Sequence, residues 1–274
     1  MTYIPFHVRT KNILKALLPV FIFSIIQSLW KHTGAHLIRD QDVAEKYTPL
    51  FINKYGYNVI GGPFSGMIYV EHAVGSSYLV KLIGVYEEIL HATVKELKAR
   101  DFKTIIDIGC AEGYYLIGLG IHNANAKLVG YDTEPTALAL SKELYNKNNL
   151  KNELILLDRC THTDLDTRIT EKTLIICDAE GFEDEILNPQ YAPRLLDVDT
   201  LVVELHEFAA PGVTARLRAR FDHSHIIETI TFKNSSGVGY PFLEELSEKE
   251  QYSLLRERGV QDQEWLIMRK NTKI

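Results

Sequence analysis

The sequence predicts an α/β protein with a Rossmann-like fold, in which a seven-stranded, mostly parallel sheet is flanked by helices and preceded by an N-terminal helical extension. Two observations carry this prediction. From about residue 101, short runs rich in β-branched residues alternate with stretches of helical periodicity. The chain has 274 residues, 46% of them hydrophobic and 24% charged, which suits one large globular domain with an appendage.

Each expected strand is a short apolar run that ends in polar or glycine residues. The strands cover Thr104–Ile108, Lys127–Tyr131, Glu153–Leu157, Thr173–Cys177, Thr200–Glu204, Ile226–Phe232 and Trp265–Arg269. The helices expected between them cover Tyr114–His122, Pro135–Asn146, Phe182–Leu187 and Val213–Phe221. Thr133 and Glu134 precede Pro135, and proline in the first turn is typical of a helix N-terminus.

The part of the chain before the sheet divides into two expected segments. Residues 1–35 contain an apolar stretch, Ile13–Trp30, which we expect to form a helix. Residues 36–100 are expected to form a lid or acceptor-recognition segment, ahead of a cofactor-binding domain over residues 101–274. Within this lid, the stretch Tyr78–Arg100 has helical spacing, and its apolar stripe is expected to contact the core.

The sequence does not determine what the apolar stretch Ile13–Trp30 packs against. Lys15 and Pro19 interrupt it, and a membrane span needs about 20 predominantly apolar residues. No small-x-small cleavage site follows Trp30, which disfavours a signal peptide. The alternatives are a helix packed on the body or on the partner of a homodimer, an interfacial membrane anchor, and a true span. We expect a cytoplasmic protein, with peripheral membrane contact through residues 13–30 as one of these alternatives.

Charge and cysteine content narrow the function classes. The net charge is −6 and no long basic run is present, so nucleic acid is not expected as a partner. The motif Asn188-Pro-Gln-Tyr191 resembles one that grips the exocyclic amine of a flipped base. It follows a helix instead of the fourth strand, which argues against base methylation. The three cysteines lack CxxC spacing and are expected to be reduced thiols.

The loop Asp107–Gly113 is the main cofactor signature. It follows the first strand, and Gly109 and Gly113 stand four residues apart where a helix begins. Glycines allow close backbone approach, and free amides at a helix N-terminus favour a carboxylate or phosphate. Position 111 is alanine, where the dinucleotide fingerprint has its second glycine. The spacing therefore disfavours a nicotinamide cofactor, although an NAD-dependent oxidoreductase remains the first alternative.

Acidic residues at successive strand ends point to S-adenosylmethionine. Asp132 follows the second strand, about 20 residues on, where a carboxylate can bind both ribose hydroxyls. Asp158 follows the third strand, where the adenine is expected. The predicted cofactor contacts are Asp107, Gly109, Cys110, Ala111, Glu112, Gly113, Tyr114, Asp132, Thr133, Asp158, Arg159, Cys160 and Asp178.

Four segments resemble the FkbM-type S-adenosylmethionine-dependent methyltransferases. They read DIGCAEGYY, LVGYDTEP, LIICDAEGFEDEIL and LVVELHEF, and they lie within Thr104–Phe208. Asp132 departs from the family's usual glutamate, and Cys110-Ala-Glu112 departs from its Ala-Asn-x. The segments GPFSGMIYVEH and KLIGVYEEIL are similar to bacterial methyltransferases associated with polysaccharides. The resemblance implies O-methylation of a hydroxyl on a glycan or related small molecule, and a late strand that is antiparallel.

The reacting centre is expected near His206, just past the fifth strand. His206 is the candidate base, because the carboxyl edge of such a sheet faces the ligand crevice. Asp178 and Glu180, which follow the fourth strand, are the other catalytic candidates. As an alternative, Asp178, Glu204 and His206 converge on one Mg²⁺ or Mn²⁺ ion. A third interpretation makes Glu204 and His206 a buried ion pair, with Glu180 and Glu183 capping the next helix.

Other residues are weaker candidates for the acceptor side. Lys81, Tyr86 and Glu87 lie before the sheet, and His225 opens the sixth strand. A non-catalytic, membrane-tethered scaffold with the same fold is the second alternative function.

Overall fold

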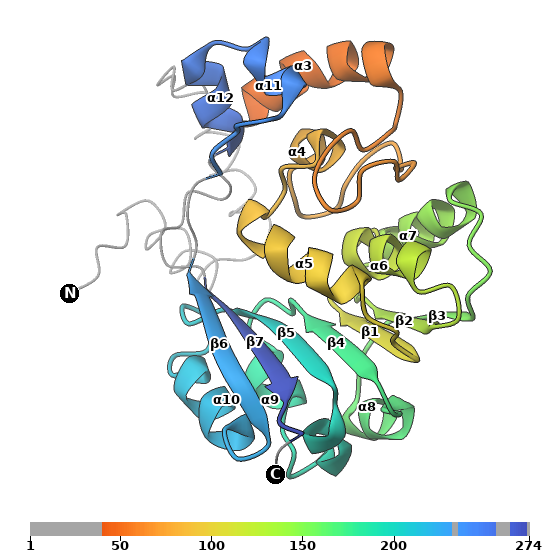
Figure 1. Cartoon of the computed structure of the whole chain (residues 1–274), viewed down its shortest axis with the longest axis vertical. Helices are drawn as coiled ribbons and strands as arrows, with labels where there is room; N and C mark the ends of the chain where they lie inside the picture. Colours follow the sequence, from red (N-terminus) through yellow and green to blue (C-terminus); the bar gives the residue numbers. More distant parts are fainter. Residues whose placement is uncertain (1–39, 232–234, 256–263, 273–274) are drawn as a thin grey trace, which may run out of the picture. The chain divides into compact units, whose positions relative to one another are not determined.

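The computed structural model describes residues 40–231, 235–255 and 264–272, which all belong to one structural unit (Figure 1). The apolar stretch Ile13–Trp30 lies outside these residues, as does Phe232 at the expected end of the sixth strand. Within the described ranges, no helix is both long enough and apolar enough to cross a membrane.

The sheet has seven strands in the order β3-β2-β1-β4-β5-β7-β6. They are β1 (Thr104–Ile108), β2 (Lys127–Tyr131), β3 (Leu154–Leu157), β4 (Thr173–Cys177), β5 (Thr200–Leu205), β6 (His225–Thr231) and β7 (Glu264–Lys270). The strands β1 to β5 pair in parallel, whereas β7 runs antiparallel to both β5 and β6. The predicted Rossmann-like sheet is confirmed, with strand ends shifted by no more than one residue.

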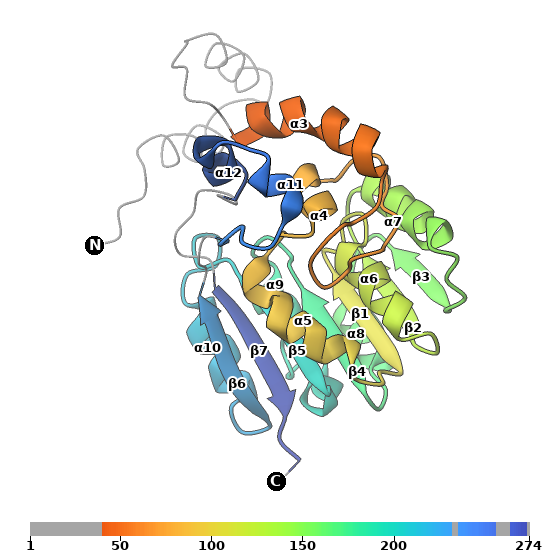
Figure 2. The ribbon, with the colours of Figure 1, turned by 45° about the horizontal axis from the view of Figure 1, so that its top comes forward.

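Helices cover both faces of the sheet (Figures 1 and 2). They are α5 (His91–Lys98), α6 (Tyr114–His122), α7 (Pro135–Lys147), α8 (His162–Arg168), α9 (Glu183–Ile186) and α10 (Val213–Phe221), with a 3-10 turn η2 (Pro193–Asp197). Alternate residues of each strand enter different cores: Ile105 packs in the core that holds the α5, α6 and α7 side chains, and Ile106 in that of α8 to α10. Every residue of β1, β4 and β5 is buried, which explains why these strands are mostly apolar; the buried acids Asp107 and Glu204 are the charged exceptions.

The expected helical stretch Tyr78–Arg100 is broken, which corrects the sequence-based prediction. It forms α4 (Tyr78–Ile83), a 3-10 turn η1 (Glu88–Leu90) and then α5. Gly84 ends α4 in a left-handed conformation with φ 89°. A Cβ atom on Gly84 would lie 2.0 Å from the carbonyl oxygen of Gly61, so two backbones meet here and the helix cannot continue. The apolar stripe of the stretch does pack in the core, as predicted.

The segment before the sheet packs against the insertion between β6 and β7. Helix α3 (Asp40–Tyr55) contacts α12 (Glu248–Leu255), and α11 (Pro241–Glu244) lies beside them (Figures 1 and 2). The rings of Phe51 and Phe242 meet edge to face, with centroids 5.0 Å apart. Two segments that are distant in the sequence therefore build one helical cap beside the sheet.

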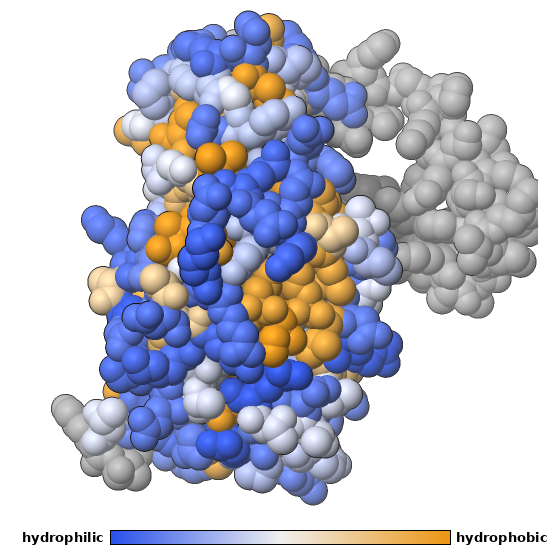
Figure 3. All heavy atoms as spheres, turned by 90° about the vertical axis from the view of Figure 1, so that its right-hand side faces the viewer, coloured by the Kyte–Doolittle hydropathy of each residue, from blue (hydrophilic) through white to orange (hydrophobic). Residues whose placement is uncertain are grey.

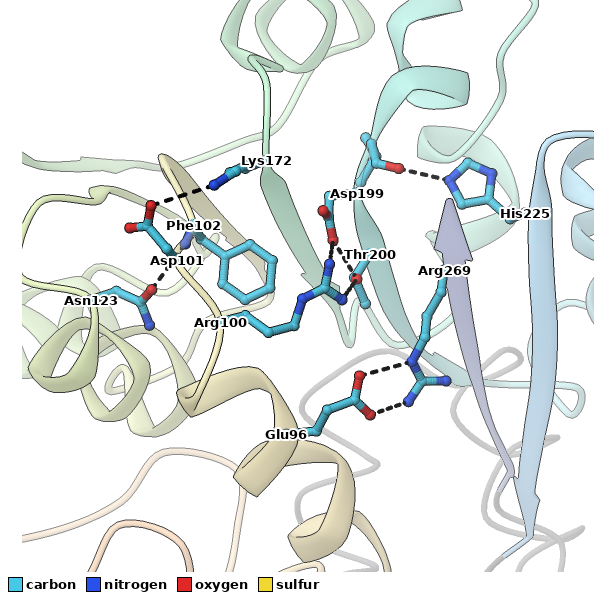
Figure 4. A network of polar contacts seen from close by, with 11 residues as sticks. Glu96, Arg100, Asp101, Phe102, Asn123, Lys172, Asp199, Thr200, His225 and Arg269 are labelled. Atoms are coloured by element: carbon cyan, nitrogen blue, oxygen red, sulfur yellow. Dashed lines mark hydrogen bonds and ion pairs between the residues drawn. The ribbon is translucent and has the colours of Figure 1, made fainter. Parts of the chain in front are cut away.

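Ion pairs fasten α5 and the chain that follows it to the amino end of the sheet (Figure 4). Arg100 pairs with Asp199 and donates to Thr200 Oγ1 over 2.9 Å. Arg269 on β7 pairs with Glu96 at 2.8 Å. These contacts orient the helix from the end of the sheet that is opposite to the carboxyl ends of the parallel strands.

Strand β3 forms one edge of the sheet, and its four residues are half-buried. Figure 3 shows this side of the molecule, and hydrophobic atoms gather at mid-height on it. No further strand pairs with β3 in the described part of the chain, so this edge is both open and apolar.

Candidate functional site

A pocket of about 480 Å³ opens where the parallel strands β1 to β4 end. Each of these strands contributes one acid to its lining: Asp107, Asp132, Asp158 and Asp178. The strand register explains the convergence, because Ile108 pairs with both Tyr131 and Cys177 and the strand ends are level. Among the other predicted cofactor contacts, the lining includes Gly109, Cys110, Ala111, Tyr114, Thr133, Arg159 and Cys160.

The loop after β1 is shaped by contacts within the protein. Gly109 has φ 82°, and a Cβ atom there would lie 1.8 Å from the carbonyl oxygen of Asp178. A Cβ atom on Gly113, with φ 89°, would lie 2.7 Å from Ser141 Oγ. The positive φ angles of both glycines agree with the prediction that they adopt backbone angles closed to other residues. The atoms that a Cβ would meet belong to the protein, whereas the sequence also suggested the approach of a ligand. Gly113 itself does not line the pocket.

Asp132 ties the loop to β2. Its Oδ2 accepts a 2.8 Å hydrogen bond from the amide of Ala111, and its Oδ1 accepts one of 2.8 Å from the amide of Glu134. Each carboxylate oxygen has a second lone-pair site. The half-buried Asp132 can therefore still accept hydroxyl donors from a ligand in the pocket.

Asp107 is the most perturbed acid of the pocket. It is 3% exposed and accepts a hydrogen bond from the amide of Leu116. Burial, together with the negative charges of Asp178 and Asp132, raises its pKa to about 8. A concentration of acids that holds one member protonated favours a ligand that carries positive charge.

Glu112 connects the loop to the segment before the sheet. It is fully buried and accepts hydrogen bonds from Tyr69 Oη at 2.5 Å, Lys81 Nζ at 2.5 Å and the amide of Val74 at 3.0 Å. Burial acts to raise the pKa of Glu112, but the charge of Lys81 and these hydrogen bonds outweigh it and lower the pKa. Glu112 does not line the pocket, and these contacts make it a structural anchor in a position where a cofactor contact was predicted.

The weaker acceptor-side candidates separate into two groups. Lys81 and Tyr86 line the pocket, with the Lys81 ammonium 4.7 Å from the centre of the Tyr86 ring. Glu87 does not line it and instead accepts a hydrogen bond from Tyr115 Oη. His225 is buried at the start of β6, where its Nε2 lies 2.8 Å from the carbonyl oxygen of Val198 (Figure 4). That is the amino end of the sheet, so the suggestion that His225 reaches the acceptor pocket is wrong.

His206 lies behind the wall of the pocket and is 2% exposed. Its Nε2 is 3.6 Å from Asp178 Oδ1, 3.6 Å from Glu180 Oε2 and 3.9 Å from Glu204 Oε1. Asp178 and Glu180 line the pocket, whereas His206 and Glu204 do not. The structure therefore brings all the predicted reacting residues together, with the two carboxylates between His206 and the pocket.

Glu183 is a functional candidate that the sequence-based prediction missed. Its Oε1 lies 2.8 Å from His206 Nδ1 and accepts hydrogen bonds from the amides of Ala179 and Gly181. Glu183 is fully buried. A signal did exist, because residues 186 and 187 are apolar and share a helical face with position 183. A glutamate on that buried face must have a polar partner.

Opposing effects act on this buried pair. Burial acts to raise the pKa of Glu183, but the hydrogen bond and charge of His206 lower it overall. Burial likewise acts to lower the pKa of His206, but Glu183, Asp178 and Glu180 raise it overall.

The known proteins to which this chain is similar are methyltransferases. The family model described as "Methyltransferase small domain" matches residues 89–177, which run from α5 to the end of β4. No curated protein sequence matches the chain. Among solved structures, similarity is found to the methyltransferase domain of METTL16, with 13% identity, a TM-score of 0.49 and coverage of 86% of this chain and 99% of that one.

Two further solved structures are similar at the same level. Precorrin-6y C5,15-methyltransferase from Geobacter metallireducens GS-15 has 13% identity and a TM-score of 0.45, covering 73% of this chain and 91% of that one. An rRNA methylase from Streptococcus thermophilus has 12% identity and a TM-score of 0.45, covering 68% and 98%. At these identities the likeness concerns the fold alone.

Proposed function

We propose that this chain, which has the Rossmann-like fold of S-adenosylmethionine-dependent methyltransferases, is such an enzyme of the FkbM type and methylates a hydroxyl of a glycan or related small molecule. The observation that carries the proposal is the pocket itself. Four acids from four consecutive parallel strands line a space of about 480 Å³, a volume suited to a cofactor and part of its acceptor.

The pocket residues fit S-adenosylmethionine in charge and in hydrogen-bonding capacity. Asp132 would hold the ribose hydroxyls, with Asp158 and Arg159 on the adenine side. The amides at the start of α6 would hold the carboxylate of the methionine part. Asp107, whose pKa burial and neighbouring acids raise to about 8, would gain a cationic neighbour. The cofactor, when bound, supplies an electrophilic methyl group on a positively charged sulfur.

The same charges disfavour NAD. A dinucleotide brings a negatively charged pyrophosphate, and the pocket lining holds five acidic residues against two basic ones, Lys81 and Arg159. Lys81 is already paired with Glu112. Position 111, where the dinucleotide fingerprint has a glycine, carries an alanine that adopts φ 45°.

An aromatic wall supports the assignment of the acceptor. Tyr86, Tyr114 and Tyr115 line the pocket, and their rings pack edge to face or tilted against one another. Flat aromatic faces with a polar rim suit the apolar face and the hydroxyls of a sugar ring. Binding of a sugar to such a surface does not require the basic patch on which binding of nucleic acid depends.

Methyl transfer requires the acceptor oxygen to lose a proton while its bond to carbon forms and the carbon–sulfur bond breaks. Asp178 and Glu180 line the pocket and are assigned the contact with the acceptor hydroxyl, whose proton one of these carboxylates takes up. His206 lies behind both and is assigned as a positioning residue, held by Glu183.

Calorimetric titration with S-adenosylhomocysteine and with NAD tests the proposal. We expect S-adenosylhomocysteine to bind and NAD to give no heat of binding. Asp132→Asn should weaken binding at least about ten-fold, since a hydrogen bond to a charged group contributes about 1.5–3 kcal/mol. Asp222→Asn is the matched control, because this carboxylate is 70% exposed on the surface. Binding of NAD without binding of S-adenosylhomocysteine would refute the proposal.

A further inference from the structure

We infer that the cluster behind the pocket wall binds one divalent transition-metal ion, with His206 Nε2 and the carboxylates of Asp178, Glu180 and Glu204 as its ligands. One donor atom each from Asp178, Glu183 and His206 lies within 4.8 Å of the other two. One carboxylate oxygen each of Asp178, Glu180 and Glu204 lies 3.6, 3.6 and 3.9 Å from His206 Nε2. The four proposed ligands come from the turn after β4 and from the end of β5, and Glu183 begins α9.

The unsatisfied nitrogen of His206 is the second, independent observation. Nε2 is buried and has no hydrogen-bond partner in the part of the chain that the structure describes. A separation of 3.6 Å from Asp178 is too long for a hydrogen bond. It is a natural distance between two ligands of one ion, because each ligand atom lies about 2.1 Å from a bound transition metal.

Glu183 orients the ligand without binding the ion. Its Oε1 lies 2.8 Å from His206 Nδ1, and the amides of Ala179 and Gly181 hold the same oxygen in place. A carboxylate that accepts a hydrogen bond from Nδ1–H leaves the lone pair of Nε2 available to a metal ion and fixes the plane of the ring. Metal-ligating histidines commonly carry such a partner.

Charge and donor type select the kind of ion. Even a protonated imidazole would bring one positive charge to the carboxylates of Asp178, Glu180, Glu183 and Glu204. A divalent ion stabilises this concentration of negative charge more effectively. One imidazole together with carboxylates suits Mn²⁺ or Zn²⁺ better than Mg²⁺, which prefers oxygen ligands alone.

The position of the ion beside the pocket gives it a role in methyl transfer, and this role rests on the proposed function. Asp178 and Glu180 belong both to the ion's ligand set and to the pocket lining. An ion held by them would face the acceptor hydroxyl and make its proton easier to remove. Binding of the ion itself does not depend on that role and can be measured without cofactor or acceptor.

The test is a Mn²⁺ titration of the chelator-treated full chain, followed by electron paramagnetic resonance. We expect one Mn²⁺ per chain, displaced by Zn²⁺. His206→Gln and Asp178→Asn should each weaken Mn²⁺ binding at least ten-fold, and Glu183→Gln by about ten-fold through loss of orientation. Glu185→Gln is the matched control, because this glutamate is on the same helix but exposed to solvent. It should bind Mn²⁺ like the unaltered chain.

Failure to bind Mn²⁺ and Zn²⁺, or equal binding by the unaltered chain and His206→Gln, would overturn the inference. If His206→Gln does not fold, as judged by circular dichroism, Asp178→Asn carries the test, because the Asp178 side chain is 23% exposed whereas that of His206 is 3% exposed. Titration with S-adenosylhomocysteine separates the two proposals. If the chain binds S-adenosylhomocysteine but no metal ion, only the proposed metal site is refuted. If it binds the metal ion but not S-adenosylhomocysteine, only the proposed function is refuted.

Discussion

Replacing Lys81 by methionine should destabilise the protein because it leaves the charge of Glu112 buried without its cation. The side chains of Lys81 and Glu112 are 3% and 0% exposed, and their charged atoms are 2.5 Å apart. Removal of one partner from a buried ion pair costs about 3–5 kcal/mol. The hydrogen bonds from Tyr69 and Val74 remain, so we expect a loss near 3 kcal/mol, or about 6–12 °C in Tm.

Urea unfolding followed by circular dichroism measures this loss, and a double-mutant cycle assigns it to the pair. Glu112→Gln alone leaves the ammonium of Lys81 buried and should cost a similar amount. The double variant should lose much less than the sum of the two single losses, because neither charge is then left alone. Lys147→Met provides the control, since its partner Glu143 lies on an exposed helix surface.

The same variant should also weaken binding of S-adenosylhomocysteine, because Glu112 holds the segment before the sheet against the cofactor loop. Single-variant losses below about 1 kcal/mol, or strictly additive losses in the cycle, would refute the assignment of this network as a buried anchor.

Three further predictions follow from local geometry and burial. Gly109→Ala should lower the melting temperature far more than Gly66→Ala, because both positions have positive φ but only at Gly109 would the added Cβ meet a backbone oxygen, at 1.8 Å; similar shifts would contradict the clash. Asp107 has a pKa of about 8 when folded against 3.8 ordinarily, so the folded chain binds the extra proton, and stability should fall by about 1.4 kcal/mol per pH unit between these values. Urea unfolding at several pH values should show this slope, and Asp107→Asn should remove it; an unchanged slope would argue against the raised pKa. The three cysteines are buried and free, so they should react with a thiol reagent only after unfolding, and rapid reaction of the native protein would show that the pocket region opens.

The fold was predictable because its signals are local. The central strands β1, β4 and β5 are short, mostly apolar runs with polar residues following them, and burial on both faces favours that pattern. Helix α8 was missed, since its sequence, HTDLDTR, has a single buried apolar residue. Its N-terminus is held instead by Thr161, whose hydroxyl accepts from the amide of Asp164.

The acids of the pocket were predictable for a related reason. Parallel strands in register end at the same edge of a sheet, so a residue that directly follows a strand is placed there by the sequence alone. Asp132, Asp158 and Asp178 obey this rule, and Asp107 is the last residue but one of β1. The glycines of the loop do adopt the left-handed backbone angles that the sequence suggested, but the atom that excludes a side chain at Gly109 belongs to the neighbouring strand end and not to a ligand.

The sequence by itself determined the strands, their common edge and the acids along that edge, because these follow from periodicity and from the ends of apolar runs. Only the tertiary structure decided which buried charges meet. Glu112 finds Lys81 and Tyr69 at separations of 31 and 43 residues, and Glu183 meets His206 across 23. A buried carboxylate must have partners, but the sequence does not name them, because they are chosen by how separate elements pack in space.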